Sequence, residues 1–302
     1  MRLTNGHRPR TRHGRNRHAI PGDAAAIAAR DLVVGYGGAR VLDGLDLVVE
    51  RGTTTALVGP NGSGKSTLLR TLVRLLRPEA GAVLLDGAAI QRLPTREVAR
   101  RLAVLPQQPE VPAGITVREL TEQGRYPHVG ALRTLGAADR DAVDRALEAT
   151  GMQSFAHRRV DELSGGERQK AWIALALAQD TPMLLLDEPT TFLDLGHQFE
   201  VLELVGRLRD ETGLTVVLVL HDLNQAARHA ARLVVLDRGA VVADGTPARV
   251  LTRELLRDIF RVHAEVTVDT DGVPVAHPKS WAGPRQDPQT QESNARVPDA
   301  PT

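Results

Sequence analysis

The sequence predicts an α/β fold with a mostly parallel core sheet, an antiparallel β subdomain near the start and an α-helical subdomain in the middle. Residues 183–186 and 214–220 are almost wholly apolar, as are strands buried on both faces of a parallel sheet. Residues 32–34 and 45–50 form short apolar runs separated by glycines, which is typical of antiparallel strands. Residues 117–150 have the apolar periodicity of helices.

The composition is that of an ordinary globular protein. Of the 302 residues, 42% are hydrophobic and 25% are charged, which excludes a wholly disordered chain, a collagen or a coiled coil. The absence of cysteine excludes disulfides, zinc–cysteine sites and thiol catalysis. No apolar run approaches the roughly 20 residues of a membrane-spanning helix, and no apolar targeting segment opens the chain. We therefore expect a soluble, cytosolic protein.

Charge and composition separate an arm and a tail from the folded body. Residues 1–18 hold six arginines and no acidic residue, so the remainder of this chain of net charge +1 carries −5. Such a basic arm is typical of a disordered extension, although it could also contact anionic lipid or nucleic acid. The folded body is expected at residues 28–275, and the proline-rich tail is predicted to be largely disordered from about residue 277.

A glycine-rich loop follows a β-branched strand near the start of the body. Gly59, Gly64, Lys65 and Ser66 match the phosphate-loop pattern G-x-x-x-x-G-K-S, and leucines at helical spacing follow until Pro78. Glycines allow backbone N–H groups to point at phosphate oxygens, and the helix N-terminus adds positive charge. Lys65 would reach the β- and γ-phosphates, and the Ser66 hydroxyl would bind Mg²⁺. The predicted phosphate contacts are Gly59, Pro60, Asn61, Gly62, Ser63, Gly64, Lys65, Ser66 and Thr67.

Two adjacent acidic residues end the apolar run at 183–186. Because ligands of open parallel sheets bind at the carboxyl ends of the strands, Asp187 and Glu188 should face the phosphates. Asp187 would serve Mg²⁺, and Glu188 would orient and deprotonate an attacking water. An acidic pair alone usually marks a solvated loop, so its value depends on the phosphate loop in the same chain.

A second anion site is predicted at the start of another helix. Ser164 and Glu167 have the spacing of a capping box, and Gly165 and Gly166 between them would leave backbone N–H groups exposed. The chain then has two phosphate-binding elements but one lysine-bearing loop. A head-to-tail dimer, in which each nucleotide contacts both chains, resolves this difference.

These motifs, in this order, resemble the nucleotide-binding domain of ABC ATPases, and the LSGGE sequence at 163–167 is specific to that superfamily. The resemblance covers residues 29–262. It implies an ATP-hydrolysing P-loop NTPase domain at 28–262 with a helical subdomain at about 108–165. Residues 1–27 would then be the arm and 263–302 a C-terminal extension. It also implies ATP and Mg²⁺ as cofactors.

The resemblance assigns roles to further residues. Tyr36 resembles the aromatic residue that stacks on adenine. Gln107 resembles the glutamine that contacts Mg²⁺ and the attacking water and links the site to the membrane partner. Asp194 resembles the residue in the loop that communicates across the dimer, and His221 resembles the histidine that holds the γ-phosphate. The implied catalytic residues are Glu188, His221 and Gln107. The implied Mg²⁺ ligands are Ser66, Gln107 and Asp187.

Four segments narrow the resemblance to importers of ferric siderophores, with cobalamin and haem importers as close relatives. They are residues 124–127 (GRYP), 163–169 (LSGGERQ), 193–198 (LDLGHQ) and 221–226 (HDLNQA). The resemblance implies a homodimer at the cytoplasmic face of the membrane, bound to an integral-membrane permease through residues 107–128. An extracytoplasmic substrate-binding protein would be an indirect partner.

Other ABC classes fit the chain less well. Chromosome-maintenance ATPases, for which the arm would contact nucleic acid, carry long coiled coils between their halves, whereas Ser164 follows Lys65 by only 99 positions. Translation-type proteins resemble two cassettes in tandem, and exporters usually fuse the cassette to membrane helices. We therefore expect an importer subunit and no nucleic-acid partner.

Overall fold

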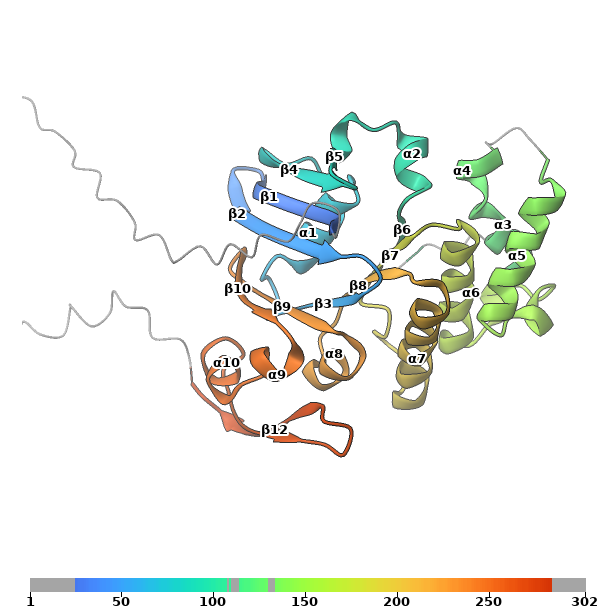
Figure 1. Ribbon diagram of the computed structural model, residues 1–302. Coiled ribbons are helices and arrows are strands. Elements are labelled where there is room, and N and C mark those ends of the chain that lie inside the picture. Colours follow the sequence, from blue (N-terminus) through green and yellow to red (C-terminus); the bar gives the residue numbers. More distant parts are fainter. Residues whose placement is uncertain (1–24, 108, 110–113, 130–133, 284–302) are drawn as a thin grey trace, which may run out of the picture.

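The computed structural model describes residues 25–107, 109, 114–129 and 134–283. Its core is a six-stranded sheet in the order β10-β9-β3-β8-β7-β6 (Figure 1). The strands are β3 (Thr54–Val58), β6 (Ala103–Leu105), β7 (Met183–Asp187), β8 (Thr215–Val219), β9 (Arg232–Asp237) and β10 (Ala240–Gly245). All neighbouring pairs are parallel except β9 and β10. This arrangement confirms the α/β class with a mostly parallel core sheet.

The core strands are apolar because both of their faces are buried. Leu184 and Val216 belong to one hydrophobic cluster, which includes helices of the second half of the chain. Their neighbours Leu185 and Val217 belong to a second cluster, which includes the antiparallel sheet. Successive side chains of a strand point to opposite faces, so continuous apolar runs are required here. The predicted buried strands therefore lie at the centre of the molecule.

An antiparallel sheet covers one side, in the order β2-β1-β4-β5. Its strands are β1 (Ala25–Tyr36), β2 (Ala39–Glu50), β4 (Ala80–Leu85) and β5 (Ala88–Ala89), with helix α1 (Lys65–Leu72) packed against them. β1 starts before residue 28, and Ile27 is fully buried, so the predicted arm is too long by three residues. Helix α1 ends well before Pro78, because Arg74 has a φ of 62° and donates to the Leu93 carbonyl oxygen at 2.6 Å.

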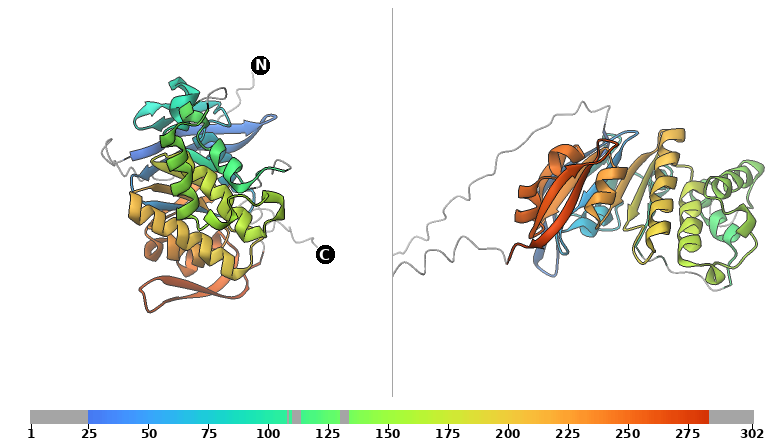
Figure 2. Two further views of the ribbon diagram at one scale, coloured as in Figure 1. Left: turned by 90° about the vertical axis from the view of Figure 1, so that its right-hand side faces the viewer. Right: turned by 90° about the horizontal axis from the view of Figure 1, so that it is seen from below.

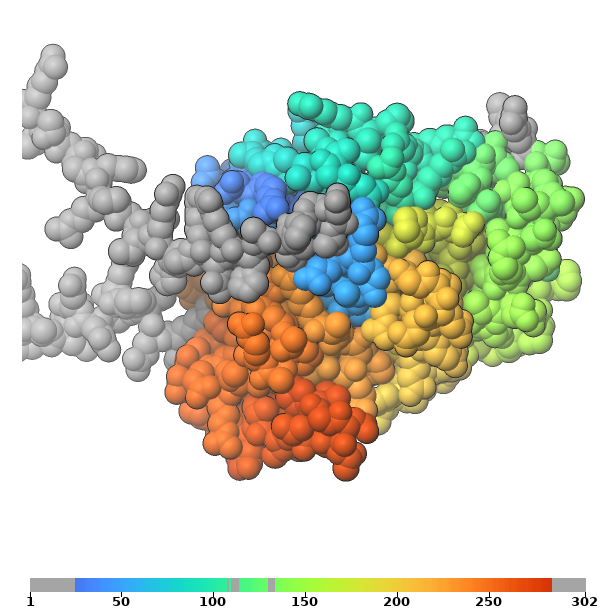
Figure 3. Space-filling view, in the orientation of Figure 1, coloured from blue at the N-terminus to red at the C-terminus, as the bar shows by residue number. Residues whose placement is uncertain are grey.

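Helices cover the other side of the core sheet and form one end of the molecule. η1 (Ile90–Arg92) and α2 (Thr95–Ala99) instead lie on the side of the antiparallel sheet, since Ile90 and Val98 belong to its cluster. The first group of covering helices comprises α3 (Val117–Gln123), α4 (Tyr126–Val129) and α5 (Ala137–Ala149). The second comprises η2 (Gln153–Phe155), η3 (Val160–Glu162), α6 (Gly165–Ala178), α7 (Leu195–Thr212) and α8 (Leu223–His229). α3 and α5 pack against α6, and this green region forms the right-hand end of the molecule (Figures 1 and 3).

The C-terminal part continues with α9 (Pro247–Val250), α10 (Arg253–Asp258) and a hairpin of β11 (Val262–Val268) and β12 (Pro274–Trp281). The hairpin lies on the outside of the molecule, away from the helical end (Figure 2). The prediction of disorder from about residue 277 is wrong up to Trp281, because His277 pairs with Glu265 across the hairpin. Residues 1–24 of the arm and 284–302 of the tail lie outside the described residues.

None of the helices within the described residues combines the length and apolar character that crossing a bilayer requires.

Candidate functional site: a nucleotide-binding loop and an acidic strand end

The predicted phosphate loop connects β3 to α1 and can only be built with glycine at two positions. Gly59 has a φ of 149°, and a Cβ there would lie 2.1 Å from the Leu236 carbonyl oxygen of β9. Gly64 has a φ of 105°, and its Cβ would lie 2.7 Å from Cδ2 of Leu42 in β2. A backbone neighbour excludes a side chain at Gly59, and the left-handed backbone disfavours one at Gly64. The loop is therefore clamped between the core sheet and the antiparallel sheet.

Lys65, the first residue of α1, bends back over this loop. Its side chain is buried, and Nζ donates to the carbonyl oxygens of Gly59 at 2.8 Å and Pro60 at 3.1 Å. Burial lowers the pKa of Lys65, and the negative charges of Glu188 and Asp187 oppose that effect. An ammonium group in this position is poised to exchange carbonyl oxygens for phosphate oxygens.

Asp187 ends β7 beside the first turn of α1. Its carboxylate is buried, and Oδ1 accepts a hydrogen bond from Ser66 Oγ at 3.4 Å. Burial raises the pKa of Asp187, and the neighbouring Glu188 carboxylate adds to the rise. A hydroxyl and a carboxylate next to each other are the hard oxygen donors that Mg²⁺ prefers. Ser66 and Asp187 therefore fit a Mg²⁺ site, as the sequence predicts.

Three side chains from different segments contact the carboxylate of Glu188. His221 Nε2 lies 2.5 Å from Oε1, while Gln107 Nε2 and Thr191 Oγ1, the latter at 3.2 Å, donate to Oε2. Glu188 itself is buried and has a φ of 52°. The structure thus brings together the three residues predicted to be catalytic, although they are far apart in the sequence.

The buried charge of Asp187 should reduce the stability of the nucleotide-free chain. The pKa of Asp187 is raised in the folded state, so the folded protein loses stability as the pH rises above the ordinary aspartate pKa of 3.8. The reason is that the unfolded chain releases this proton first. We expect Asp187→Asn to raise the melting temperature at pH 7 and to give no gain below about pH 4, where both forms are neutral. Thermal unfolding without nucleotide at the two pH values measures this difference, and an equal gain at both would contradict it.

The predicted second anion site begins α6 with the expected cap. Ser164 N donates to Glu167 Oε2 at 2.8 Å, and Glu167 N donates to Ser164 Oγ at 3.3 Å. Gly165 is exposed, but Gly166 is buried. The prediction that both glycines lie open is therefore wrong for Gly166, whose Cβ would lie 2.2 Å from Cδ2 of His197. Glycine is needed there because an imidazole ring packs on the helix.

Asp194 caps the helix that carries this ring. Its Oδ1 accepts from His197 N at 3.0 Å, and its Oδ2 lies 2.7 Å from His197 Nδ1. These two hydrogen bonds lower the pKa of Asp194. The contact of His197 with Asp194 was not predicted, although an Asp three residues before a His at a helix start has the spacing of a cap.

Tyr36 and Thr191 are the remaining side chains of the candidate site. Tyr36 lies at the tip of the β1–β2 hairpin and is 48% exposed, so its ring is free to meet a planar ligand. Thr191, which holds the Glu188 carboxylate, was not predicted, because a threonine after a strand has no distinctive spacing.

Comparisons with known proteins agree with this geometry. A family model described as ABC transporter matches residues 42–191. A probable siderophore transport system ATP-binding protein of Bacillus subtilis is 49% identical over 245 residues, which are 81% of this chain and 89% of that protein. The chain belongs to the family of ABC transporter ATP-binding proteins.

Two further matches extend the family assignment. A ferric enterobactin transport ATP-binding protein of Escherichia coli is 46% identical over 261 residues, covering 86% of this chain and 96% of that protein. A solved structure described as an inward-facing metal-chelate type ABC transporter matches with a TM-score of 0.74 and 27% identity, covering 85% of this chain and 98% of that one. The fold is therefore that of an ABC ATPase, and the phosphate loop, β7 and α6 contain the motifs expected of a nucleotide-binding subunit.

Proposed function

We propose that this chain is the ATP-hydrolysing subunit of an importer of ferric siderophore complexes. The observation that carries the ATPase part is the position of Glu188, held by Gln107, His221 and Thr191 at the end of the strand that faces the phosphate loop. The siderophore part is supported by the names of the relatives that cover most of the chain.

The reaction follows from the charges and hydrogen bonds of the site. Lys65 and the backbone N–H groups of the loop bind the phosphates and hold the γ-phosphate in line for attack. Glu188 accepts a proton from the attacking water, while the bond from the γ-phosphorus to the β-phosphate oxygen breaks. Ser66, Asp187 and Gln107 would hold Mg²⁺, which neutralises charge that develops on the phosphates.

The hydrogen bonds that Glu188 accepts restrict its access to an attacking water. Gln107 and Thr191 both donate to Oε2, and each carboxylate oxygen offers about two acceptor positions. Only Oε1, beside His221, retains a position for a water. Movement of Gln107 on nucleotide binding would free a second acceptor position, on Oε2, which connects the segment that follows Gln107 to catalysis.

Each ATP is proposed to lie between two copies of the chain. Ser164 and Gly165 are exposed at the N-terminus of α6, where backbone N–H groups and the helix dipole attract anions. A second chain would present its bound γ-phosphate to this end of α6. The homodimer would lie on the cytoplasmic face of the membrane, attached to a permease that receives the ferric complex from a substrate-binding protein.

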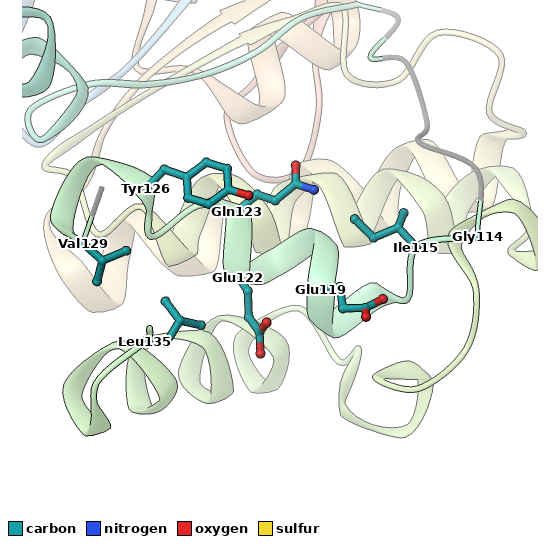
Figure 4. A pocket seen from close by; sticks show the side chains of 8 residues that line it. All are labelled: Gly114, Ile115, Glu119, Glu122, Gln123, Tyr126, Val129 and Leu135. Atoms are coloured by element: carbon teal, nitrogen blue, oxygen red, sulfur yellow. The ribbon is translucent and has the colours of Figure 1, made fainter. Parts of the chain in front are cut away.

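A pocket of about 470 Å³ at the helical end is proposed to receive the permease. Among the described residues, its lining includes Glu119 and Glu122 but no lysine or arginine, so it suits a basic segment. Figure 4 shows both glutamates on α3, with Val129 and Leu135 at one end of the pocket and Ile115 at the other. Apart from Val129 and Leu135, the lining residues belong to the predicted docking segment at 107–128, of which residues 108 and 110–113 lie outside the described residues.

Reversing charge in the pocket should weaken attachment to the permease. We expect Glu122→Lys to reduce the amount of permease that copurifies with the chain by about tenfold, the effect of about 1.4 kcal/mol. The matched control is Glu148→Lys, the same charge change at an exposed position of α5. Equal recovery of the permease with both variants would place the docking surface elsewhere.

Uptake of labelled substrates tests the proposed function as a whole. In cells that lack the native gene, the wild-type chain should restore uptake of ferric siderophore, whereas Glu188→Gln should not. Labelled cobalamin and haem, measured in parallel, test the alternatives. If Glu188→Gln failed to restore only cobalamin or only haem uptake, that substrate would replace the siderophore in the assignment. If wild type and Glu188→Gln gave the same uptake of every substrate, the proposed function would be refuted.

A further inference from the structure

A partly buried pair of amides joins α7 to α8. Gln225 in α8 is only 6% exposed, and its Nε2 donates to Gln198 Oε1 in α7 at 2.6 Å. Gln198 Nε2 in turn donates to the Leu193 carbonyl oxygen at 2.9 Å. Breaking this contact is costly on the α8 side, because the buried amide of Gln225 would lose its partner. The two helices are therefore tied together just after the loops that carry Asp194 and His221.

The amide pair closes a ring of hydrogen bonds around the catalytic residues. At one end, Glu188 N donates to the Val219 carbonyl oxygen at 3.1 Å, and the Glu188 carboxylate contacts His221. At the other end, Gln225 N donates to Asp222 Oδ1 at 3.0 Å while its side chain contacts α7. Residues 188–198 and 219–225 thus form two segments joined at both ends. A displacement of one segment must displace the other or break a buried hydrogen bond.

The same α7 turn also contacts the start of α6. His197, the neighbour of Gln198, packs against Gly166 and is held by Asp194. The first turn of α7 therefore contacts Gly166 of α6 on one side and, through Gln225, the helix that follows His221 on the other. In the proposed dimer these two sides belong to different ATP molecules.

We propose that the Gln198–Gln225 pair is a positioning contact that couples the two ATP sites of the dimer. When a partner's ATP engages the N-terminus of α6, the α7 turn moves with it. The amide pair transmits that movement to α8 and hence to His221 and Glu188, which act on the chain's own ATP. The inference rests on the proposed function, because it requires two ATP molecules shared between two chains.

Steady-state ATPase measurements on the full 302-residue chain test this coupling. Gln198→Met and Gln225→Met keep the length of the side chain and remove the hydrogen bond between the amides. Each should lower the Hill coefficient for ATP from about 2 towards 1 and reduce kcat at least about fivefold, without weakening binding of a fluorescent ATP analogue. The double variant should lose no more than the larger single effect, as residues that act through one contact do.

Asn224→Ala is the matched control. Asn224 precedes Gln225, and its side-chain amide makes two hydrogen bonds with the backbone of Ala276 in β12. It should lower the melting temperature and leave the Hill coefficient unchanged. If the methionine variants behaved like this control, the pair would be merely structural and the inference would be wrong. If the wild-type chain itself stayed monomeric with ATP and showed no cooperativity, the proposed dimer would fail first.

Discussion

Glu188→Gln should abolish ATP hydrolysis and trap two chains around ATP. Removal of a general base lowers the rate by about 10²–10⁴, and the amide keeps the size of the carboxylate. ATP binding should survive, because the phosphates are held by Lys65 and by the loop. Phosphate release in single-turnover experiments measures the first effect. Size-exclusion chromatography with Mg²⁺ and ATP measures the second.

A control variant and the size of the rate loss decide how the Glu188→Gln result is interpreted. Glu148→Gln, a change of the same kind on the exposed face of α5, should hydrolyse ATP at the wild-type rate and should not accumulate as a dimer. A Glu188→Gln rate within about tenfold of the wild type would exclude Glu188 as the base. A variant that binds ATP but remains monomeric would instead refute the shared-nucleotide dimer while leaving the base in place.

The parts of the fold that the sequence predicts well are those in which local pattern and tertiary environment agree. The apolar run at 183–186 becomes the interior strand β7 because both faces of the core sheet are covered. The capping spacing of Ser164 and Glu167 becomes a cap because a helix start satisfies both hydrogen bonds locally. These signals lie within a few residues and do not depend on distant segments.

The missed features depend on contacts between segments that are far apart in sequence. From the sequence, Gly166 is predicted to form an open anion site. Glycine is required there because the ring of His197, from a different helix, packs against it. The tail near His277 reads as disordered from its prolines, but pairing with β11 holds it in a hairpin. The sequence shows that a residue such as Gly166 is distinctive, but the contact that explains it comes from a segment that is distant in the sequence.

The second large effect is expected at Lys65, where loss of the ammonium should weaken ATP binding more than it weakens the fold. A hydrogen bond to a charged group contributes about 1.5–3 kcal/mol, so Lys65→Ala should reduce the affinity for ATP by about 10- to 100-fold. Titration with a fluorescent ATP analogue measures this loss. Turnover at the wild-type rate and affinity would contradict the assignment of Lys65 to the phosphates.

Lys65→Met separates the charge from the packing of the side chain. Methionine retains the aliphatic stem and removes the buried ammonium, whose pKa is lowered mainly by burial. In the wild type, the unfolded chain holds this proton up to about the ordinary value of 10.5, while the folded chain releases it earlier. The stability of the wild type should therefore rise relative to Lys65→Met as pH increases through that window. A gap that is constant with pH would contradict the lowered pKa of Lys65 and would mean that its carbonyl contacts and the two carboxylates offset the cost of burial.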